Sequence, residues 1–155
     1  MVLTEEERKA RKKEYNTRSD VRAKNKARFQ TPEFKAKVKA RQEIPENKAK
    51  VKNAKEYTRL KVLQYYSKLL SKSDIPCCNC CKTNNHIAFL AIDHIAGKKQ
   101  MDSEPELVKL GYSSKFASDR LVLWIKKNNY PHGFQILCHN CNMAKGFYGK
   151  CPHKK

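Results

Sequence analysis

The stretch that decides the fold runs from Leu137 to Gly146 and reads Leu-Cys-His-Asn-Cys-Asn-Met-Ala-Lys-Gly. Cys138 and Cys141 form a Cys-x-x-Cys pair, whose tight turn aims both sulfurs at one point, as in one half of a tetrahedral zinc site. The other half must come from the second cysteine cluster, Cys77–Cys81. Two such pairs are a strong zinc signal, so the sequence predicts one structural zinc ion.

The upstream cluster offers two overlapping pairs, Cys77 with Cys80 and Cys78 with Cys81, and the spacing alone does not choose between them. Either choice places four thiolates around the ion, which closes the site and leaves no open position for chemistry. In a domain of this size we expect zinc binding and folding to be coupled.

All seven cysteines lie after residue 76, and no secretory signal follows Met1. Clustered pairs in such a chain are typical of reduced metal ligands rather than disulfides, which favours an intracellular location. We expect Cys151 and His153 to be unligated, with a further metal-ligand pair as the alternative.

Between the cysteine clusters, the apolar run 89–92 ends in Asp93 and His94. Zinc would therefore hold the two ends of a unit that contains Asp93, His94 and Asn142. The hydrophobic periodicity and the helix-start signals of this half predict an α+β unit. Its expected elements are a strand at 88–93, a loop at 95–118 with a short helix near 105–110, a helix from 118 to about 128, a strand at 134–137 and a helix at 141–147.

The order of these motifs resembles that of the zinc-bound HNH, or His-Me finger, endonucleases, especially those of phage type. The resemblance is carried by the Cys-x-x-Cys knuckle, by Ile-Asp-His at 92–94, by Leu-Cys-x-x-Cys-Asn-x-x-Lys at 137–145, and by Tyr-Pro-His-Gly-Phe-Gln-Ile-Leu-Cys at 130–138. It covers residues 76–153, about half the chain. It implies a small zinc-stabilised ββα-metal (HNH) nuclease domain that hydrolyses phosphodiester bonds.

By this resemblance, His94 is the general base that takes a proton from the attacking water, which requires a neutral imidazole. Asp93 and Asn142 hold one catalytic divalent ion, magnesium or manganese, since hard cations select oxygen ligands. Lys145 is a candidate phosphate contact, with a solvated helix lysine as the alternative.

The resemblance also favours Cys78 with Cys81, because the family's knuckle often reads Cys-x-Cys-Cys-Gly. The expected zinc ligands are then Cys78, Cys81, Cys138 and Cys141. Two positions depart from the family pattern: Lys82 replaces the knuckle glycine, and Gly133 stands where the middle Asn of the HNH motif props the catalytic loop. We therefore expect the loop to be held in another way, or activity to be reduced.

The 155 residues include 34 Lys and Arg against 15 Asp and Glu, a formal net charge of +19. An excess this large predicts a polyanionic partner, and we expect double-stranded DNA. A membrane surface is the rival, but no apolar run reaches the roughly 18 residues of a spanning helix. We expect no membrane binding, and a monomer or homodimer.

The charge is concentrated in residues 1–72, which hold 22 basic and 9 acidic side chains and too few large apolar ones to bury a core. A weak repeat with an offset of 13 residues starts at Asp20, Glu33 and Glu46, each beside a helix-start signal. We expect short basic helices along a phosphate backbone; the alternative is a charged arm with no fixed path. The candidate DNA contacts are Lys145 and, in this arm, Arg22, Lys24, Arg28, Lys35, Lys37, Arg41, Lys48 and Lys50.

The third repeat runs without a break into an amphipathic helix that ends near Ser71, with Leu60, Leu63, Tyr66 and Leu70 at helical spacing. The expected organisation is a basic DNA-binding arm at 1–55, an amphipathic connecting helix at 56–75 and an HNH nuclease domain at 76–155.

The leading hypothesis is a metal-dependent DNA endonuclease of phage, viral, homing or mobile-element type, which nicks DNA or cuts both strands. In a phage or virus it would act in the host cytoplasm. One alternative is a zinc-stabilised nucleic-acid-binding module without cleavage, which Gly133 supports. The other is a nuclease that resolves branched DNA junctions.

Overall fold

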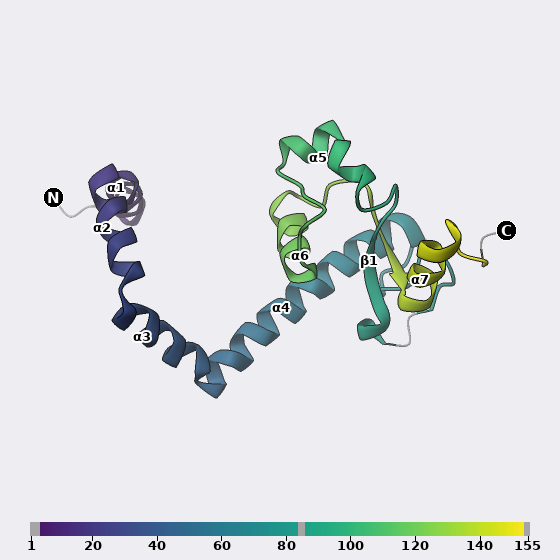
Figure 1. Ribbon diagram of the computed structural model, residues 1–155, viewed down its shortest axis with the longest axis horizontal. Coiled ribbons are helices and arrows are strands. Elements are labelled where there is room, and N and C mark those ends of the chain that lie inside the picture. Colours follow the sequence, from purple (N-terminus) through teal and green to yellow (C-terminus); the bar gives the residue numbers. More distant parts are fainter. Residues whose placement is uncertain (1–3, 84–85, 154–155) are drawn as a thin grey trace. The chain divides into compact units, whose positions relative to one another are not determined.

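The computed structural model describes residues 4–83 and 86–153 (Figure 1). The described chain is an α+β structure with 65% helix and one two-stranded sheet. It divides into two compact units, residues 1–51 and 52–155. No helix in the described ranges combines the length and the apolar character that crossing a membrane requires.

The first unit consists of helices joined by one-residue breaks: α1 (Glu5–Thr17), α2 (Ser19–Gln30), α3 (Pro32–Glu43) and the start of α4 (Pro45–Tyr66). The starts of the last three follow the expected 13-residue offset. At α3 the hydroxyl of Thr31 accepts a hydrogen bond from the N–H of Phe34 at 3.3 Å, and Pro32 occupies the first helical position, where no N–H partner is needed.

Helix α1 is an addition to the prediction, which contains no separate helix before Ser19. Its sequence signal is a capping box, in which Thr4 and Glu7 satisfy each other's backbone. The N–H of Glu7 donates to Thr4 Oγ1 at 3.3 Å, and the N–H of Thr4 donates to Glu7 Oε2 at 2.8 Å.

These helices bury few side chains. Helices α1 and α3 contain no buried residue, and Val21 is the one buried residue of α2. The eight predicted DNA contacts in this unit are all exposed: Arg22, Lys24, Arg28, Lys35, Lys37, Arg41, Lys48 and Lys50. Capping and helix propensity, rather than a core, therefore support the first unit.

The second unit is built on an antiparallel hairpin of β1 (Leu90–His94) and β2 (Phe134–Cys138), in which His94 pairs with Phe134. All five residues of β2 are buried, as expected for a strand covered on both faces. Helix α7 (His139–Tyr148) follows β2 directly and packs against both strands (Figure 1).

The core of this unit joins the hairpin to the later part of α4 and to two helices in the connection between the strands, α5 (Pro105–Lys109) and α6 (Ser118–Lys127). Its larger side chains include Val62, Leu63, Tyr66, Met101, Tyr112, Trp124, Ile125 and Phe134. The ring of Tyr112 lies 5.4 Å from that of Trp124 and 6.0 Å from that of Phe134, centroid to centroid. This aromatic cluster borders the end of β1.

The first strand begins two residues later than the expected position 88. The reason is a 3-10 turn, η2 (Ile87–Phe89), in which His86 Nδ1 accepts a hydrogen bond from the N–H of Ala88 at 3.1 Å. The final helix begins at His139 rather than at Cys141, because Cys138 acts as its N-cap.

The expected apolar face of the connecting helix is only partly correct. Leu63 and Tyr66 are buried, whereas Leu70 is 36% exposed. Helix α4 ends at Tyr66 and a π-helical turn, η1 (Ser67–Ser71), follows. The wider turn changes the helical phase, so Leu70 no longer faces the core.

A substitution that removes the hydroxyl of Tyr66 tests the packing of α4 within the second unit. The hydroxyl donates to Pro131 O at 2.6 Å, and burial raises its pKa, so it stays protonated. Tyr66→Phe leaves that carbonyl without its donor and should lower the free energy of unfolding by about 1–3 kcal/mol. Urea denaturation of the zinc-loaded full chain measures the change.

Tyr65→Phe is the matched control. Tyr65 is 39% exposed and contacts Tyr130 through its ring, with centroids 4.3 Å apart. The free energy of unfolding of the Tyr65→Phe variant should stay within about 0.5 kcal/mol of wild type. Equal effects of the two substitutions would contradict the proposed role of the Tyr66 hydroxyl.

Candidate metal centre and polar site

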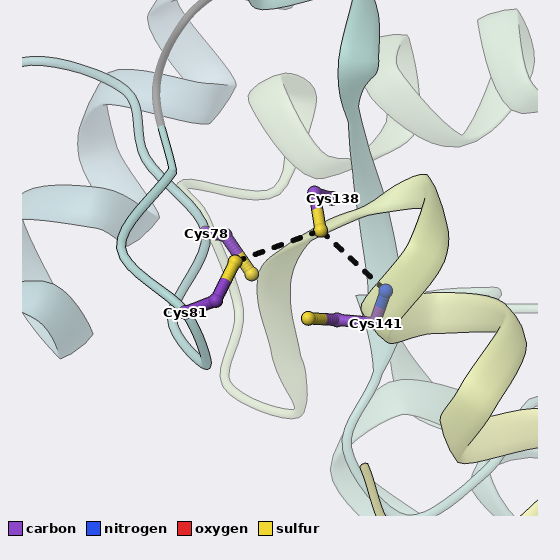
Figure 2. A group of neighbouring side chains, drawn as sticks. All are labelled: Cys78, Cys81, Cys138 and Cys141. Atoms are coloured by element: carbon purple, nitrogen blue, oxygen red, sulfur yellow. Dashed lines mark hydrogen bonds between the residues drawn. The ribbon is translucent and has the colours of Figure 1, made fainter. Parts of the chain in front are cut away.

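Four cysteine sulfurs meet where the knuckle before β1 approaches the junction of β2 and α7. Figure 2 shows Cys78 and Cys81 from the knuckle facing Cys138 and Cys141. All four Sγ atoms lie within 4.8 Å of one another, and those of Cys81 and Cys138 are 3.7 Å apart. The structure therefore assembles the four predicted zinc ligands, whereas Cys77 belongs to no metal-binding group among the described residues.

The donor set fits zinc. Tetrahedral zinc binds thiolates at about 2.3 Å, which places neighbouring sulfurs about 3.8 Å apart. The Cys81–Cys138 separation of 3.7 Å agrees with this value. A closed set of four thiolates would make the ion structural, with no position for a substrate.

The knuckle forms its turn with Lys82 at the position where the HNH proteins that it resembles often have glycine. The N–H of Lys82 donates to Cys78 O, and the N–H of Cys78 donates to Thr83 O, both at 2.9 Å. Lys82 adopts φ 60°, in the left-handed region that glycine enters at least cost. The position thus has the conformation expected of the missing glycine, and Lys82 bears the strain.

Burial raises the pKa of Cys138 and Cys141, and neighbouring sulfurs add to the effect at Cys141. At Cys81 burial acts in the same direction, but the hydrogen bonds to Thr83, Cys78 and Cys138 together outweigh it and lower the pKa to about 6. Several thiolates at this separation repel one another. A divalent cation would stabilise all of them together.

The remaining cysteines are not all remote from this centre. Cys80, Cys151 and His153 form a second group with Cys141, in which all ligand atoms again lie within 4.8 Å of one another. His153 Nδ1 is 3.3 Å from the sulfur of Cys151 and 3.5 Å from that of Cys141. Cys151 and His153, expected from the sequence to be unligated, thus lie where the alternative, a further metal-ligand pair, requires them to be.

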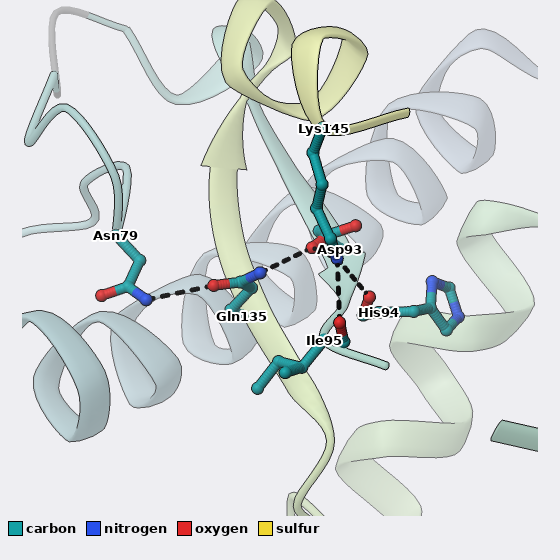
Figure 3. Close-up of polar contacts among 6 residues, drawn as sticks. All are labelled: Asn79, Asp93, His94, Ile95, Gln135 and Lys145. Atoms are coloured by element: carbon teal, nitrogen blue, oxygen red, sulfur yellow. Dashed lines mark hydrogen bonds and ion pairs between the residues drawn. The ribbon is translucent and has the colours of Figure 1, made fainter. Parts of the chain in front are cut away.

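A polar network surrounds the carboxylate of Asp93 (Figure 3). Asp93 Oδ2 accepts from Lys145 Nζ and from Gln135 Nε2, both at 2.7 Å. Gln135 Oε1 in turn accepts from Asn79 Nδ2 at 3.1 Å. The buried carboxylate thus joins α7, β2 and the knuckle. The sequence prediction missed Gln135 and Asn79; a polar Gln within an otherwise apolar strand was the available signal.

Lys145 also holds the loop that leaves β1. Its ammonium donates to His94 O at 2.6 Å and to Ile95 O at 3.1 Å. The N–H of Ile95 donates to Gly133 O at 2.9 Å. The carbonyl of Gly133 and the ammonium of Lys145 thus support the loop where the family pattern has an Asn side chain.

Gly133 is required by its own conformation. Its φ is 98°, and a Cβ there would lie 2.8 Å from the methyl carbon of Met101. An Asn at this position would be strained in the backbone and crowded against Met101. The local fold therefore favours glycine at position 133.

The imidazole of His94 extends away from Asp93 and Lys145 (Figure 3). Neighbouring residues of a strand face opposite sides, and the ring packs on Phe134 and Tyr112 with centroids 5.3 and 6.0 Å away. Its Nε2 is buried and has no hydrogen-bond partner among the described residues. Burial lowers the pKa of His94, so the ring is neutral at pH 7.

Asn142 is half-buried on α7, three residues before Lys145 and so on the same helical face. In the described part of the chain, Asp93 is hydrogen-bonded to Lys145 and Gln135 but not to Asn142. Three oxygens converge on the Lys145 ammonium: Asp93 Oδ2, His94 O and Ile95 O. Oxygen ligands suit magnesium or manganese, but a divalent ion at Asp93 must compete with this lysine.

Cys138→Ser tests the four-thiolate site. Because metal binding and folding should be coupled, we expect loss of bound zinc and of the cooperative unfolding transition of the second unit. Metal analysis by mass spectrometry and thermal denaturation measure the two effects. Cys77→Ser, a buried cysteine outside both ligand groups, should keep both properties. Cooperative unfolding of a wild-type chain that holds no zinc would contradict the site.

Comparisons of the chain with protein-family models, with curated proteins and with solved structures found no match. The functional assignment therefore rests on the site itself.

Proposed function

We propose that this protein is a metal-dependent DNA endonuclease of the HNH, ββα-metal type. The observation that carries the proposal is the contact of Asp93, near the end of β1, with Lys145 of α7, beside four converging cysteines. On a two-stranded hairpin followed directly by a helix, Asp93 contacts Lys145, and the neutral His94 is the next residue of the strand. This combination suits hydrolysis of a phosphodiester.

In this proposal His94 accepts the proton of the attacking water, for which its lowered pKa keeps it neutral. This role requires the imidazole to rotate out of its contact with Phe134 and toward the substrate. Asp93 and Asn142 would hold the divalent ion, which would stabilise the charge of the leaving oxygen. Lys145 releases the carboxylate and contacts the scissile phosphate.

The first unit serves as the DNA-holding arm. Residues 1–51 hold 16 Lys and Arg against 8 Asp and Glu, and the eight candidate cations identified above are exposed. Contacts with phosphates position a protein on DNA without reading its sequence. The arm thus supplies affinity, while the second unit supplies the chemistry.

One specific observation favours a second candidate, a zinc-stabilised nucleic-acid-binding module without cleavage. Asp93 Oδ2 is occupied by Lys145 and Gln135, and the His94 ring extends away from it. In this arrangement Lys145 occupies the carboxylate that would hold a metal ion, and the imidazole is not directed toward that carboxylate. Cleavage assays separate the two candidates.

The assay offers supercoiled plasmid, linear duplex and a four-way junction to the full chain with magnesium or manganese. His94→Ala should reduce the cleavage rate by about 100-fold or more, the usual contribution of a general base, while DNA affinity stays near wild type. Asp93→Asn should lose activity that high metal concentrations partly restore.

Wild-type activity should fall only as the pH drops below about 6.5, the ordinary pKa of histidine, because burial lowers the pKa of His94.

His132→Ala is the control, since His132 is exposed and makes no hydrogen bond in the described structure. It should cut like wild type. His94→Gln, with retained zinc and circular dichroism, separates loss of the base from loss of packing around the buried ring. Undiminished DNA cleavage by both His94 variants would contradict the mechanism. A wild-type chain that binds DNA but cleaves none of the three substrates would support the second candidate.

Deletion of residues 1–44, which ends just before α4, tests the arm. Each phosphate neutralised adds about −0.9 to the slope of log affinity against log salt. The deletion should therefore weaken duplex binding and flatten that slope, as measured by fluorescence anisotropy at several salt concentrations. Zinc content should not change. If affinity and slope both stay the same, the arm does not hold DNA.

A further inference from the structure

Cys141 lies at the centre of two groups of metal-ligating side chains. Its sulfur belongs to the four-thiolate set with Cys78, Cys81 and Cys138, and also to the set with Cys80, Cys151 and His153. Within each set every ligand atom is within 4.8 Å of the others. The two sets share this one atom.

We propose that the chain binds two zinc ions, bridged by the sulfur of Cys141. Two tetrahedral ions require eight coordination positions, and one shared thiolate fills two of them. Seven ligands are therefore needed. The structure places seven there: Cys78, Cys80, Cys81, Cys138, Cys141, Cys151 and His153.

The chemistry of the second set matches zinc as well as the first set does. It contains three sulfurs and one imidazole nitrogen, a common composition of structural zinc sites. Beyond the shared thiolate it adds two thiolates and one neutral imidazole. The charge of the two added thiolates balances that of a second divalent ion. Cys141 and Cys151 are buried, which disfavours unpaired thiolates there and favours metallated ones.

The local backbone accounts for the second set. Helix α7 ends at Tyr148, and Gly149 follows with φ 74°, a conformation that turns the chain back at little cost to glycine. The turn returns Cys151 to the first turn of the helix that carries Cys141. Cys80 reaches the same point from the knuckle, one residue from the first-set ligand Cys81.

The second ion gives α7 a fixed position. The first ion holds only the start of this helix, through Cys141. The second ties the segment after its end, through Cys151 and His153, to the knuckle. Because α7 carries Lys145, both ions contribute to the position of the ammonium at Asp93.

Metal analysis of the full chain, purified with zinc and freed of loose metal by gel filtration, tests the stoichiometry. We expect two zinc ions per wild-type chain. Cys80→Ser and Cys151→Ser should each retain one, since the four-thiolate set remains intact, and Cys77→Ser should retain two. One zinc per wild-type chain would overturn the second ion but not the four-thiolate site. No zinc would overturn both.

Cadmium tests the shared sulfur. With ¹¹³Cd in place of zinc, two resonances should appear and split each other by coupling through Cys141 Sγ. In Cys151→Ser one resonance should remain, without the splitting. Two uncoupled resonances in the wild type would overturn the bridge, as would a wild-type spectrum that Cys80→Ser and Cys151→Ser leave unchanged.

Discussion

The convergence of cysteine sulfurs at the junction of β2 and α7 is the constraint on which the second unit depends. Cysteines from three segments meet there: the knuckle, the end of β2 and the first turn of α7. As thiolates, these side chains repel one another. A divalent cation would convert that repulsion into attraction and thereby link segments more than 50 residues apart. The hairpin is only five residues long on each strand, and two strands alone are marginal in water. The hairpin therefore depends on the aromatic core, and a metal ion at the cysteine cluster would add to its support.

A second interaction, the Asp93–Lys145 pair, determines what this hairpin can do. Buried charges are tolerated when they are paired and hydrogen-bonded, and here Gln135 satisfies the carboxylate further. The same ammonium contacts two main-chain carbonyls of the loop after β1. One side chain of α7 thus fixes both the carboxylate and the adjoining loop. The buried carboxylate requires a cation beside it, and Lys145 supplies that cation here.

Much of this architecture follows from local sequence patterns. Pro32 and Pro45, each followed by a glutamate, mark helix starts. These signals can be identified from the sequence because they act within the first turn of the helix. The Cys-x-x-Cys spacing identifies knuckles for the same reason. The position of Cys151 beside Cys141 depends on the turn at Gly149 and on tertiary packing, which spacing does not encode. Likewise, the orientation of the His94 ring is set by Tyr112 and Phe134, which lie far along the chain.

The two units differ in what maintains their structure. Helices α1, α2 and α3 have 13, 12 and 12 residues, near the length at which isolated helices are marginal in water. Only Val21 among their residues is buried, and their excess of positive charge disfavours close approach of one helix to another. Ordering such a segment costs conformational entropy that no core offsets. A polyanion would offset it, because each phosphate pairs with a cation and relieves the repulsion between neighbouring lysines and arginines. The helical form of the first unit is therefore expected to gain stability in contact with a polyanion.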